Sequence, residues 1–314
     1  MRVFVAGATG AIGRPLVSAL VAAGHHVLGM TSSQSGLAIV KDRGADGVVA
    51  NALDAAAVDA AIAGFRPDAV IEELTSLPKD YTPESMRAAA EQDRRLRLEG
   101  GRNVHNAALA ARAKRYLVQS TGFFYAPGAG PASETESLAL DASPAIAASV
   151  LTYTQIEQRV LGAPEWKGTA LRYGFFYGPG TYQDPRDGSV TRQVREQKYP
   201  IIGSGAGVFS FVHVEDAAAA TVAALEAEPG IYNVVDDDPS EMRLWLPAFA
   251  RFVGAPPPAS ISEEKAQSFA GPDAVYYATR LRGAGNAKAK RELGFAPRRL
   301  EWLTQARSGA GARA

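Results

Sequence analysis

Three glycines near the start of the chain have the spacing of a turn that binds phosphate groups. Gly7, Gly10 and Gly13 directly follow the apolar residues 3–6, and residues 15–21 continue with apolar side chains at helical spacing. In a turn from strand to helix, the first glycine permits a sharp bend, the second leaves room for a pyrophosphate, and the third lets the helix pack closely. Backbone N–H groups and the helix dipole then face the anion. We therefore expect a dinucleotide here, and an ordinary glycine-rich turn is the less favoured alternative.

Further motifs follow this turn along nearly the whole chain. They read PDAVI (67–71), LVQST followed by Tyr125 (117–121), LRYGFFYGPG (171–180), FVHVEDAA (211–218), GIYNVVDDDP (230–239) and ELGF (292–295). With the Gly-x-x-Gly-x-x-Gly spacing, which encloses Ala8 and Thr9, they resemble the extended short-chain dehydrogenase/reductase family, of the NAD-dependent epimerase/dehydratase type. This resemblance implies the α/β class, with a Rossmann-type doubly wound parallel sheet and a smaller C-terminal lobe that binds the substrate.

The resemblance also implies a proton-transfer apparatus, of which this chain has only part. Relatives usually carry a Ser or Thr and a later Tyr-x-x-x-Lys motif, whose Tyr exchanges a proton with the substrate while hydride moves to or from the nicotinamide. The Lys is required because an unperturbed Tyr titrates near pH ~10, and a nearby cation lowers that pKa. Thr121 fits the Ser/Thr position. The sequence between Lys114 and Lys167 contains no lysine, so the Tyr-x-x-x-Lys motif is absent.

Two alignments of the helix that should carry this motif stay open. If Glu157 matches the acidic residue that follows the motif, Ser149 takes the Tyr position and Tyr153 the Lys position. If Tyr153 is instead the catalytic Tyr, Glu157 replaces the Lys, and its carboxylate would raise the pKa of the phenol. The first alignment keeps more of the helix pattern. Thr121 would then hold the substrate oxygen, and Tyr153, or water held by Ser149, would transfer the proton.

The expected cofactor is NADP, with NAD as the alternative. In folds of this type a carboxylate at the end of the second strand selects the free 2′-hydroxyl of the adenosine ribose. Here that strand ends at Thr31, Ser32 and Ser33, whose hydroxyls suit a 2′-phosphate, with Lys41 or Arg43 as more distant charges. The residues expected to contact the cofactor are Gly7, Thr9, Gly10, Ala11, Ile12, Gly13, Thr31, Ser32, Asn51, Leu53 and Leu74.

The expected substrate is a small hydroxyl or carbonyl compound. Arg172 and Tyr177 flank the entry to the second lobe and should line the substrate pocket. Phe209 lies where the resemblance implies an arginine that holds the diphosphate of a nucleotide-sugar, so nucleotide-sugars should be poor substrates. Glu72 and Glu73 end the fourth strand on opposite faces, and a solvated strand end is their expected role.

The composition excludes several classes of protein. The 314 residues include 33 Lys and Arg and 33 Asp and Glu, so no net charge draws the chain to nucleic acid or to an anionic membrane. Cysteine is absent, and His25, His26 and His105 show no metal-ligand spacing, so no metal site is expected. His213 is expected to be a structural residue at a strand-to-helix junction. Without a leader sequence or a long apolar run, a cytoplasmic location is expected.

The elements that must position these groups alternate between strands and helices in the first half of the chain. Strands are expected over 2–6, 26–30, 47–50, 69–74, 115–120 and 169–175. A long helix is expected over about 83–113, with a solvated charge run and a glycine pair that is either a close-packing point or a kink. Another helix is expected over 146–162, and relatives commonly form homodimers through these two helices.

The expected domain organisation is a dinucleotide-binding domain over 1–175. Residues 176–314 would form mainly the substrate lobe, with some segments returning to the first domain. The sequence thus predicts an NAD(P)-dependent oxidoreductase or epimerase/dehydratase-like enzyme with a non-standard catalytic motif. The alternative is a dinucleotide-binding regulatory or scaffold protein without turnover, which the missing Lys favours.

Overall fold

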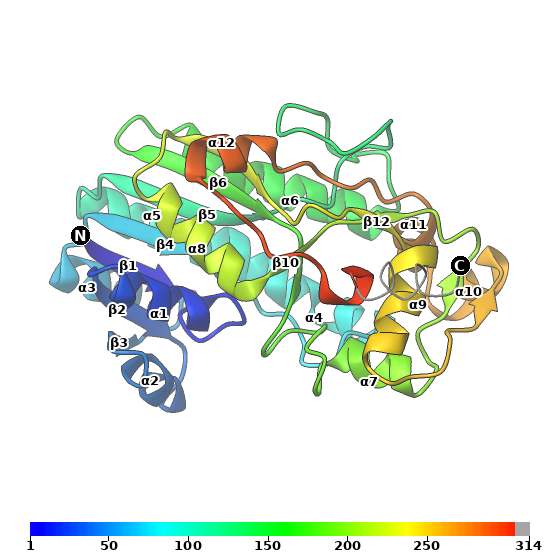
Figure 1. Ribbon diagram of the computed structural model, residues 1–314. Helices are drawn as coiled ribbons and strands as arrows, with labels where there is room; N and C mark the ends of the chain where they lie inside the picture. Colours follow the sequence, from blue (N-terminus) through cyan, green and yellow to red (C-terminus); the bar gives the residue numbers. More distant parts are fainter. Residues whose placement is uncertain (305–314) are drawn as a thin grey trace.

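A parallel sheet of seven strands forms the centre of the molecule (Figure 1). The computed structural model describes residues 1–304. From one edge to the other, the strands are β11 (Gly230–Val234), β6 (Lys167–Tyr173), β5 (Arg115–Thr121), β4 (Ala69–Glu72), β1 (Arg2–Ala6), β2 (His26–Thr31) and β3 (Asp46–Val49). The strand order reverses between β1 and β4, and ligands bind doubly wound sheets at the carboxyl ends of strands beside such a reversal. The expected Rossmann-type fold is therefore confirmed.

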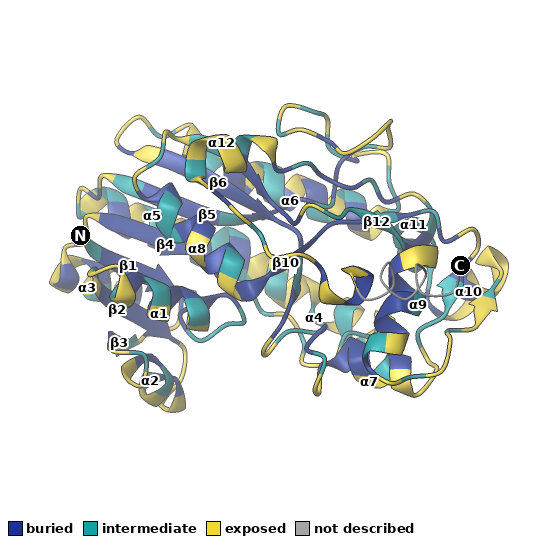
Figure 2. Cartoon of the chain, in the orientation of Figure 1, coloured by how far each residue is buried: buried dark blue, intermediate teal, exposed yellow. Residues whose placement is uncertain are grey.

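Helices cover both faces of this sheet. On one face lie α1 (Gly13–Ala22), α8 (Val214–Ala224) and α12 (Ala287–Leu293). On the other lie α3 (Ala55–Phe65), α5 (Gly101–Ala110) and α6 (Pro144–Leu161), while α2 (Gln34–Lys41) packs beside β2 and β3. Figure 2 shows the strands as a buried layer between helices whose outer sides are exposed. Because both faces are covered, the middle of each central strand is largely apolar, as in residues 3–6 of β1.

The long charged helix expected from the sequence is three consecutive elements. α4 (Pro83–Arg95) is followed by a π-helical turn, η1 (Leu96–Gly100), and then by α5. A Cβ atom at Gly101 would lie 2.3 Å from Oε1 of Glu72, so the glycine pair is a close-packing point against β4. The expectation that the charge run is solvated was wrong for Arg97, whose side chain is buried.

The second lobe is built around an aromatic core. Its helices are α7 (Ser189–Arg195), α9 (Met242–Phe252), α10 (Glu263–Phe269) and α11 (Pro272–Thr279). Its short strands pair as β7 (Phe175–Tyr177) with β10 (Phe211–His213), β8 (Ile201–Ile202) with β13 (Ser260–Ile261), and β9 (Val208–Phe209) with β12 (Ser240–Glu241). Figure 1 shows these helices gathered at the end of the molecule away from β3. Phe211, Trp245, Phe249 and Trp302 pack together in the core of this lobe.

The loop between β4 and α4 connects this lobe to the sheet through hydrogen bonds. The Tyr182 hydroxyl donates to the Pro78 carbonyl oxygen at 2.6 Å. The Tyr81 N–H donates to Ser189 Oγ at 3.0 Å, and Gln193 Nε2 donates to the Tyr81 carbonyl oxygen at 2.7 Å. The loop therefore lies between the end of β4 and helix α7.

Candidate functional site

The glycine turn has the geometry that a pyrophosphate requires. Gly7 has a φ of 90°, and a Cβ there would lie 2.4 Å from the Glu73 carbonyl oxygen. A Cβ at Gly13 would lie 2.1 Å from the Gly7 carbonyl oxygen, whereas one at Gly10 would come no closer than 3.4 Å to the protein. Gly10 therefore borders open space. Ile12, the N-cap of α1, offers no side-chain acceptor to the first helical turn. Arg14 N–H donates to the Gly10 carbonyl oxygen at 3.2 Å, so the helix dipole rather than a full set of open N–H groups favours an anion at this end of α1.

Two arginines lie beside this turn. Arg14 Nε donates to the Thr9 carbonyl oxygen at 2.9 Å, and Arg43 Nε donates to the Arg14 carbonyl oxygen at 3.0 Å. Thr9 and Ala11 are partly exposed within the turn. Arg43 thus reaches the glycine turn, although it follows α2 in the sequence.

The hydroxyl groups at the end of β2 differ in their surroundings. Thr31 is buried, with its Oγ1 so close to Gly36 that a Cβ there would lie 2.0 Å away. Ser33 caps α2 by accepting the Gly36 N–H at 3.3 Å. Ser32 is exposed, and its hydroxyl makes no hydrogen bond to the described residues. Ser32 is therefore the hydroxyl that is open to a ligand.

The other residues expected at the adenine side lie after β3 and β4. Asn51 Oδ1 accepts the Leu53 N–H at 3.0 Å, which forms a short turn at the surface. Leu53 is half-buried and Leu74 is buried. All three follow the carboxyl ends of their strands, at the same edge of the sheet as the glycine turn.

Thr121 is the last residue of β5 and is buried. Its Oγ1 is excluded from solvent and has no hydrogen-bond partner within residues 1–304. A buried hydroxyl without a partner is costly, so this group is suited to a ligand that supplies one.

The two candidate proton carriers on α6 are placed differently. Ser149 Oγ donates to the Ala145 carbonyl oxygen one turn back, at 2.9 Å. Tyr153 is half-buried, and the Arg97 guanidinium carbon lies 5.0 Å from its ring centre. Burial raises the pKa of the Tyr153 hydroxyl, while Arg97 acts to lower it and Asp93 to raise it. A cation therefore does lie beside Tyr153, although α6 itself provides none at the expected position.

Tyr153 belongs to an aromatic cluster, which we define as Phe123, Phe124, Tyr153, Phe175 and Tyr277. Phe123 and Phe175 stack with ring centres 4.1 Å apart. The Phe124 ring lies 6.2 Å from both Tyr153 and Tyr277. All members except Phe124 are partly exposed. This cluster was not predicted from the sequence, although Phe123 and Phe124 come directly after Thr121 and Gly122.

Arg172, which the sequence places in the substrate pocket, is buried and paired with Glu157 of α6 in the structure. Its guanidinium makes two hydrogen bonds of 2.7 Å to the Glu157 carboxylate and donates to the Tyr125 hydroxyl at 2.8 Å. Glu157 also accepts a hydrogen bond from Ser120 Oγ at 2.6 Å. Arg172 and Glu157 are both buried, so they form a structural ion pair between β6 and α6. Glu157 is thus held by Arg172 and does not stand in for the missing lysine.

Tyr177 and Phe209, the other residues expected at the substrate pocket, are also buried. Tyr177 packs edge to face on Trp302, with ring centres 4.9 Å apart. The Phe209 ring packs against Phe175, with ring centres 4.8 Å apart. His213 caps α8 by accepting the Glu215 N–H at 3.2 Å. The prediction that His213 is a structural residue is confirmed.

The expectation that Glu72 and Glu73 are solvated was wrong, because both are buried. Glu72 accepts two hydrogen bonds of 2.9 Å from Arg159 and one of 2.5 Å from the Tyr116 hydroxyl. Glu73 points to the opposite face, where Tyr173 donates to it at 3.1 Å and Oε2 has no partner among the described residues. Burial raises the pKa of Glu73 to about 8.

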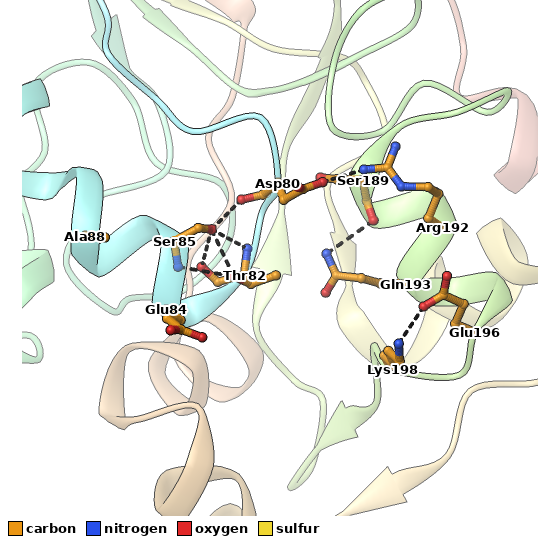
Figure 3. Close-up of a pocket in the computed structure, with 10 residues that line it drawn as sticks. All are labelled: Asp80, Thr82, Glu84, Ser85, Ala88, Ser189, Arg192, Gln193, Glu196 and Lys198. Carbon is orange, nitrogen blue, oxygen red and sulfur yellow. Dashed lines mark hydrogen bonds and ion pairs between the residues drawn. The ribbon is translucent and has the colours of Figure 1, made fainter.

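A polar hollow of about 520 Å³ lies between the start of α4 and helix α7 (Figure 3). It is lined by Asp80, Thr82, Glu84, Ser85, Ala88, Ser189, Arg192, Gln193, Glu196 and Lys198. Asp80 and Arg192 form an ion pair beside it. None of the residues discussed above as cofactor or catalytic candidates lines this hollow, so we do not take it as the candidate active site. In the described part of the chain, no group of three His, Asp or Glu side chains could hold a metal ion.

Comparison with known proteins gives the class of this protein. The profile of the NAD dependent epimerase/dehydratase family matches residues 3–234, and the chain belongs to that family. The chain is 42% identical over 307 residues to a 3-diazoavenalumate denitrifying reductase from a Streptomyces species, covering 96% of this chain and 98% of the relative. It is 28% identical over 322 residues to a 4-hydroxy-2-methyl-3-oxo-4-farnesyl-3,4-dihydroquinoline-1-oxide ketoreductase from Stigmatella aurantiaca, covering 95% and 92%.

Solved structures share the fold at lower identity. A UDP-glucose 4-epimerase from Thermotoga maritima, solved with UDP-glucose, is 21% identical with a TM-score of 0.76, and the match covers 96% of each chain. A UDP-glucose 4-epimerase from Thermus thermophilus, solved with NAD, is 24% identical with a TM-score of 0.72, again over 96% of each chain. The protein is thus an enzyme of the oxidoreductase and epimerase type, from an NAD-dependent family. Within residues 1–304, no helix has the length and apolar character to span a membrane.

Proposed function

We propose that this enzyme is a nicotinamide-dependent reductase that delivers hydride to a small, flat and largely apolar substrate. The observation that carries the proposal is the aromatic cluster, whose stacked Phe123 and Phe175 rings remain partly exposed. Aromatic faces of this kind favour planar, apolar molecules. A diphosphate would instead require a cation, and Phe209 offers none. Nucleotide-sugars are therefore expected to be poor substrates.

The 42% identical relative suggests the reaction class. Its name describes a reductase that removes nitrogen from a diazo compound, and we propose the same chemistry for this chain. Hydride adds to the carbon that bears the N₂ group, and the C–N bond electrons leave with N₂: R–N₂⁺ + NAD(P)H → R–H + N₂ + NAD(P)⁺. This step consumes no proton, whereas reduction of a ketone requires one. A site without Tyr-x-x-x-Lys is compatible with such a reaction.

Thr121 and Tyr153 are the residues to which we assign catalytic roles. Thr121 would orient a polar group of the substrate, because its buried hydroxyl lacks a partner among the described residues. Tyr153 would provide a proton where the product oxygen needs one. Ser149 is the weaker candidate, because its hydroxyl already donates to Ala145.

The test is to supply purified enzyme and a reduced nicotinamide carrying deuterium with a conjugated diazo compound, a cyclic ketone or a nucleotide-sugar. We expect deuterium at the reduced carbon, together with N₂ release from the diazo compound. Thr121→Ala should lower turnover ~10²-fold or more without weakening cofactor binding. Efficient conversion of a nucleotide-sugar, or failure to reduce either other substrate, would contradict the proposal.

We infer that NADPH is the preferred cofactor. No carboxylate follows β2, the Ser32 hydroxyl is open, and Arg43 reaches the glycine turn. These features favour a 2′-phosphate over a free 2′-hydroxyl. Calorimetry should give NADPH an affinity at least equal to that of NADH. A clear preference for NADH would refute this assignment.

We also infer a homodimer built on α4 and α6. None of the α4 residues is buried, and α6 leaves Leu151 and Leu161 exposed. Helices with such open faces can pack as a four-helix bundle across a two-fold axis.

A further inference from the structure

The active site lacks the lysine of its family but contains a buried arginine from another helix. Arg97 is the second residue of the π-helical turn η1, 56 positions before Tyr153 in the sequence. Its side chain is 5% exposed. A charge so deeply buried requires compensation, because removing it from water costs several kcal/mol. The surroundings of Arg97 therefore indicate what it does.

Protein contacts satisfy only one edge of this guanidinium. Nε donates to Asp93 Oδ2 at 2.7 Å, and Asp93 Oδ1 in turn accepts the Ser76 N–H at 2.6 Å. The two terminal amino groups of Arg97 make no hydrogen bond to any residue from 1 to 304. A guanidinium has five N–H donors, so four of them remain for a ligand.

The guanidinium also lies against the aromatic cluster. Its central carbon is 5.0 Å from the Tyr153 ring centre, within the range of a cation–π contact. Tyr153 packs against Phe124, which continues the segment that begins at Thr121. Arg97 therefore borders Tyr153, one of the two residues assigned catalytic roles, and Tyr153 contacts the segment that follows the other, Thr121.

We propose that Arg97 is the cation of this active site and that its free amino groups bind the substrate oxygen on which negative charge accumulates as hydride arrives. The proposal rests on the hydride-transfer function above. In a ketone, hydride adds to carbon and the C=O electron pair moves to oxygen. In a diazo compound with a conjugated oxygen, ⁻O–C=C–N₂⁺, hydride replaces N₂ and leaves ⁻O–C=C–H. Arg97 stabilises the oxyanion in both cases, and Tyr153 can then protonate it.

The charged and titratable groups around Arg97 and Tyr153 come from three elements and from the residue that follows β4. Asp93 lies on α4, Glu72 ends β4 and Glu73 follows it, and Tyr277 lies on α11. Asp93 holds the guanidinium from the side away from its free amino groups, so we assign it as a positioning residue.

The test compares four variants of the full chain. Arg97→Lys keeps the charge but loses the planar guanidinium with its two terminal amino groups, and Arg97→Gln removes the charge. Asp93→Asn combined with Arg97→Met removes both charges, so it remains informative if Arg97→Gln does not fold. Arg95→Gln changes an exposed arginine two residues away, which pairs with Glu99, and serves as the matched control.

We expect Arg97→Gln and the double variant to lower kcat ~10²-fold or more, with KM and NADPH affinity changed much less. Arg97→Lys should recover part of kcat, and Arg95→Gln should match the wild type. In the variants that lack Arg97, the alkaline limb of the pH profile of kcat should also lie at higher pH than in the wild type. Wild-type kcat in the double variant, or equal losses in the lysine and uncharged variants, would overturn the assignment.

A second measurement separates this proposal from the proposed function. The ultraviolet titration of Tyr153, obtained as the difference from Tyr153→Phe, requires no substrate. Its midpoint should be higher in Arg97→Gln than in the wild type, because Arg97 lowers the pKa of Tyr153 while Asp93, which raises it, is retained. If wild-type enzyme reduces neither substrate class, the proposed function fails whatever this titration shows. An unchanged midpoint in an active wild-type enzyme would instead refute the role of Arg97 alone.

Discussion

Glu73 should make the stability of the protein depend on pH. Its folded-state pKa is about 8, above the ordinary value of 4.5, because burial disfavours the charged carboxylate. Between these pH values the unfolded chain releases the proton and the folded chain keeps it. The stabilisation is therefore complete below pH 4.5 and is lost as pH rises to about 8, by at most ~1.4 kcal/mol per pH unit. Denaturant unfolding across this pH range measures the slope.

Glu73→Gln is the variant that isolates this carboxyl group. The amide stays neutral, so the variant should be more stable than the wild type at pH 8, and its unfolding free energy should fall less steeply with pH. The unfolding free energy of Glu73→Gln should still fall somewhat as pH rises, because burial also raises the pKa of Asp236 to about 8. Glu84→Gln, at an exposed position on α4, is the control and should follow the wild type. Identical slopes in Glu73→Gln and the wild type would contradict the prediction.

Gly10 should be required for the cofactor and dispensable for the fold. A Cβ atom there would meet no protein atom closer than 3.4 Å, whereas a larger side chain would fill the space left for the pyrophosphate. Gly10→Val is expected to abolish dinucleotide binding in calorimetry while it leaves the melting temperature within a few degrees of the wild type. Ala22→Val, at an exposed position near the end of α1, should leave both unchanged. Normal NADPH affinity in Gly10→Val would show that the cofactor binds elsewhere.

The sequence predicts some residues of the candidate site better than others. The glycine turn and Thr121 depend on local spacing, which a sequence displays directly. Arg97 lies in a run of charged residues, and periodicity alone assigns such a run to solvent. Arg172 was assigned to the substrate pocket because it flanks the entry to the second lobe, but its partner Glu157 comes from a separate helix. Ion pairs between distant segments are not visible as a pattern.

At the scale of elements, the glycine at the start of α5 should tolerate no side chain. A Cβ at Gly101 would lie 2.3 Å from Glu72 Oε1 and 2.5 Å from Arg159 Nη2, and these two groups form a buried ion pair. Separating them leaves a buried charge without its partner, so Gly101→Ala should cost ~3 kcal/mol of folding free energy or more.

Gly64 provides the matched comparison. It also lies in a helix, α3, but a Cβ there would have no heavy atom within 4 Å. Gly64→Ala should therefore stabilise the protein by ~0.5–1 kcal/mol through helix propensity. The same substitution is thus expected to change the unfolding free energy with opposite signs at the two sites. A stabilising Gly101→Ala would show that the ion pair can move aside.

Six of the seven strands of the central sheet were predicted, because parallel strands buried on both faces appear as short apolar runs between helical patterns. The strand β11 was not predicted. The expected strand over 47–50 corresponds to β3, which is shifted by one residue. The short strands of the second lobe were not predicted. Several of them have two residues, and such strands depend on pairing between distant segments rather than on their own composition.

At the scale of the whole molecule, Leu151 should control the proposed homodimer. It is 52% exposed on α6, which leaves a large apolar side chain at the surface. Leu151→Asp should yield monomers in light scattering at micromolar concentration with little change in the far-ultraviolet spectrum. Leu244→Asp, at another exposed leucine on α9, is the control and should leave the oligomeric state unchanged. A wild-type protein that is monomeric at these concentrations would refute the homodimer.

The position of β11 has a consequence for synthesis of the chain on the ribosome. β11 forms the edge of the sheet beside β6, yet it ends at residue 234. Until that segment emerges, the hydrogen-bonding edge of β6 stays open. Helix α8, which covers α1, emerges only shortly before β11. Nascent chains that end before β11 should therefore be prone to aggregation through this unpaired edge and should bind chaperones. Ribosome-bound chains extended well past residue 234 should acquire protease resistance in one step, whereas shorter chains should remain sensitive.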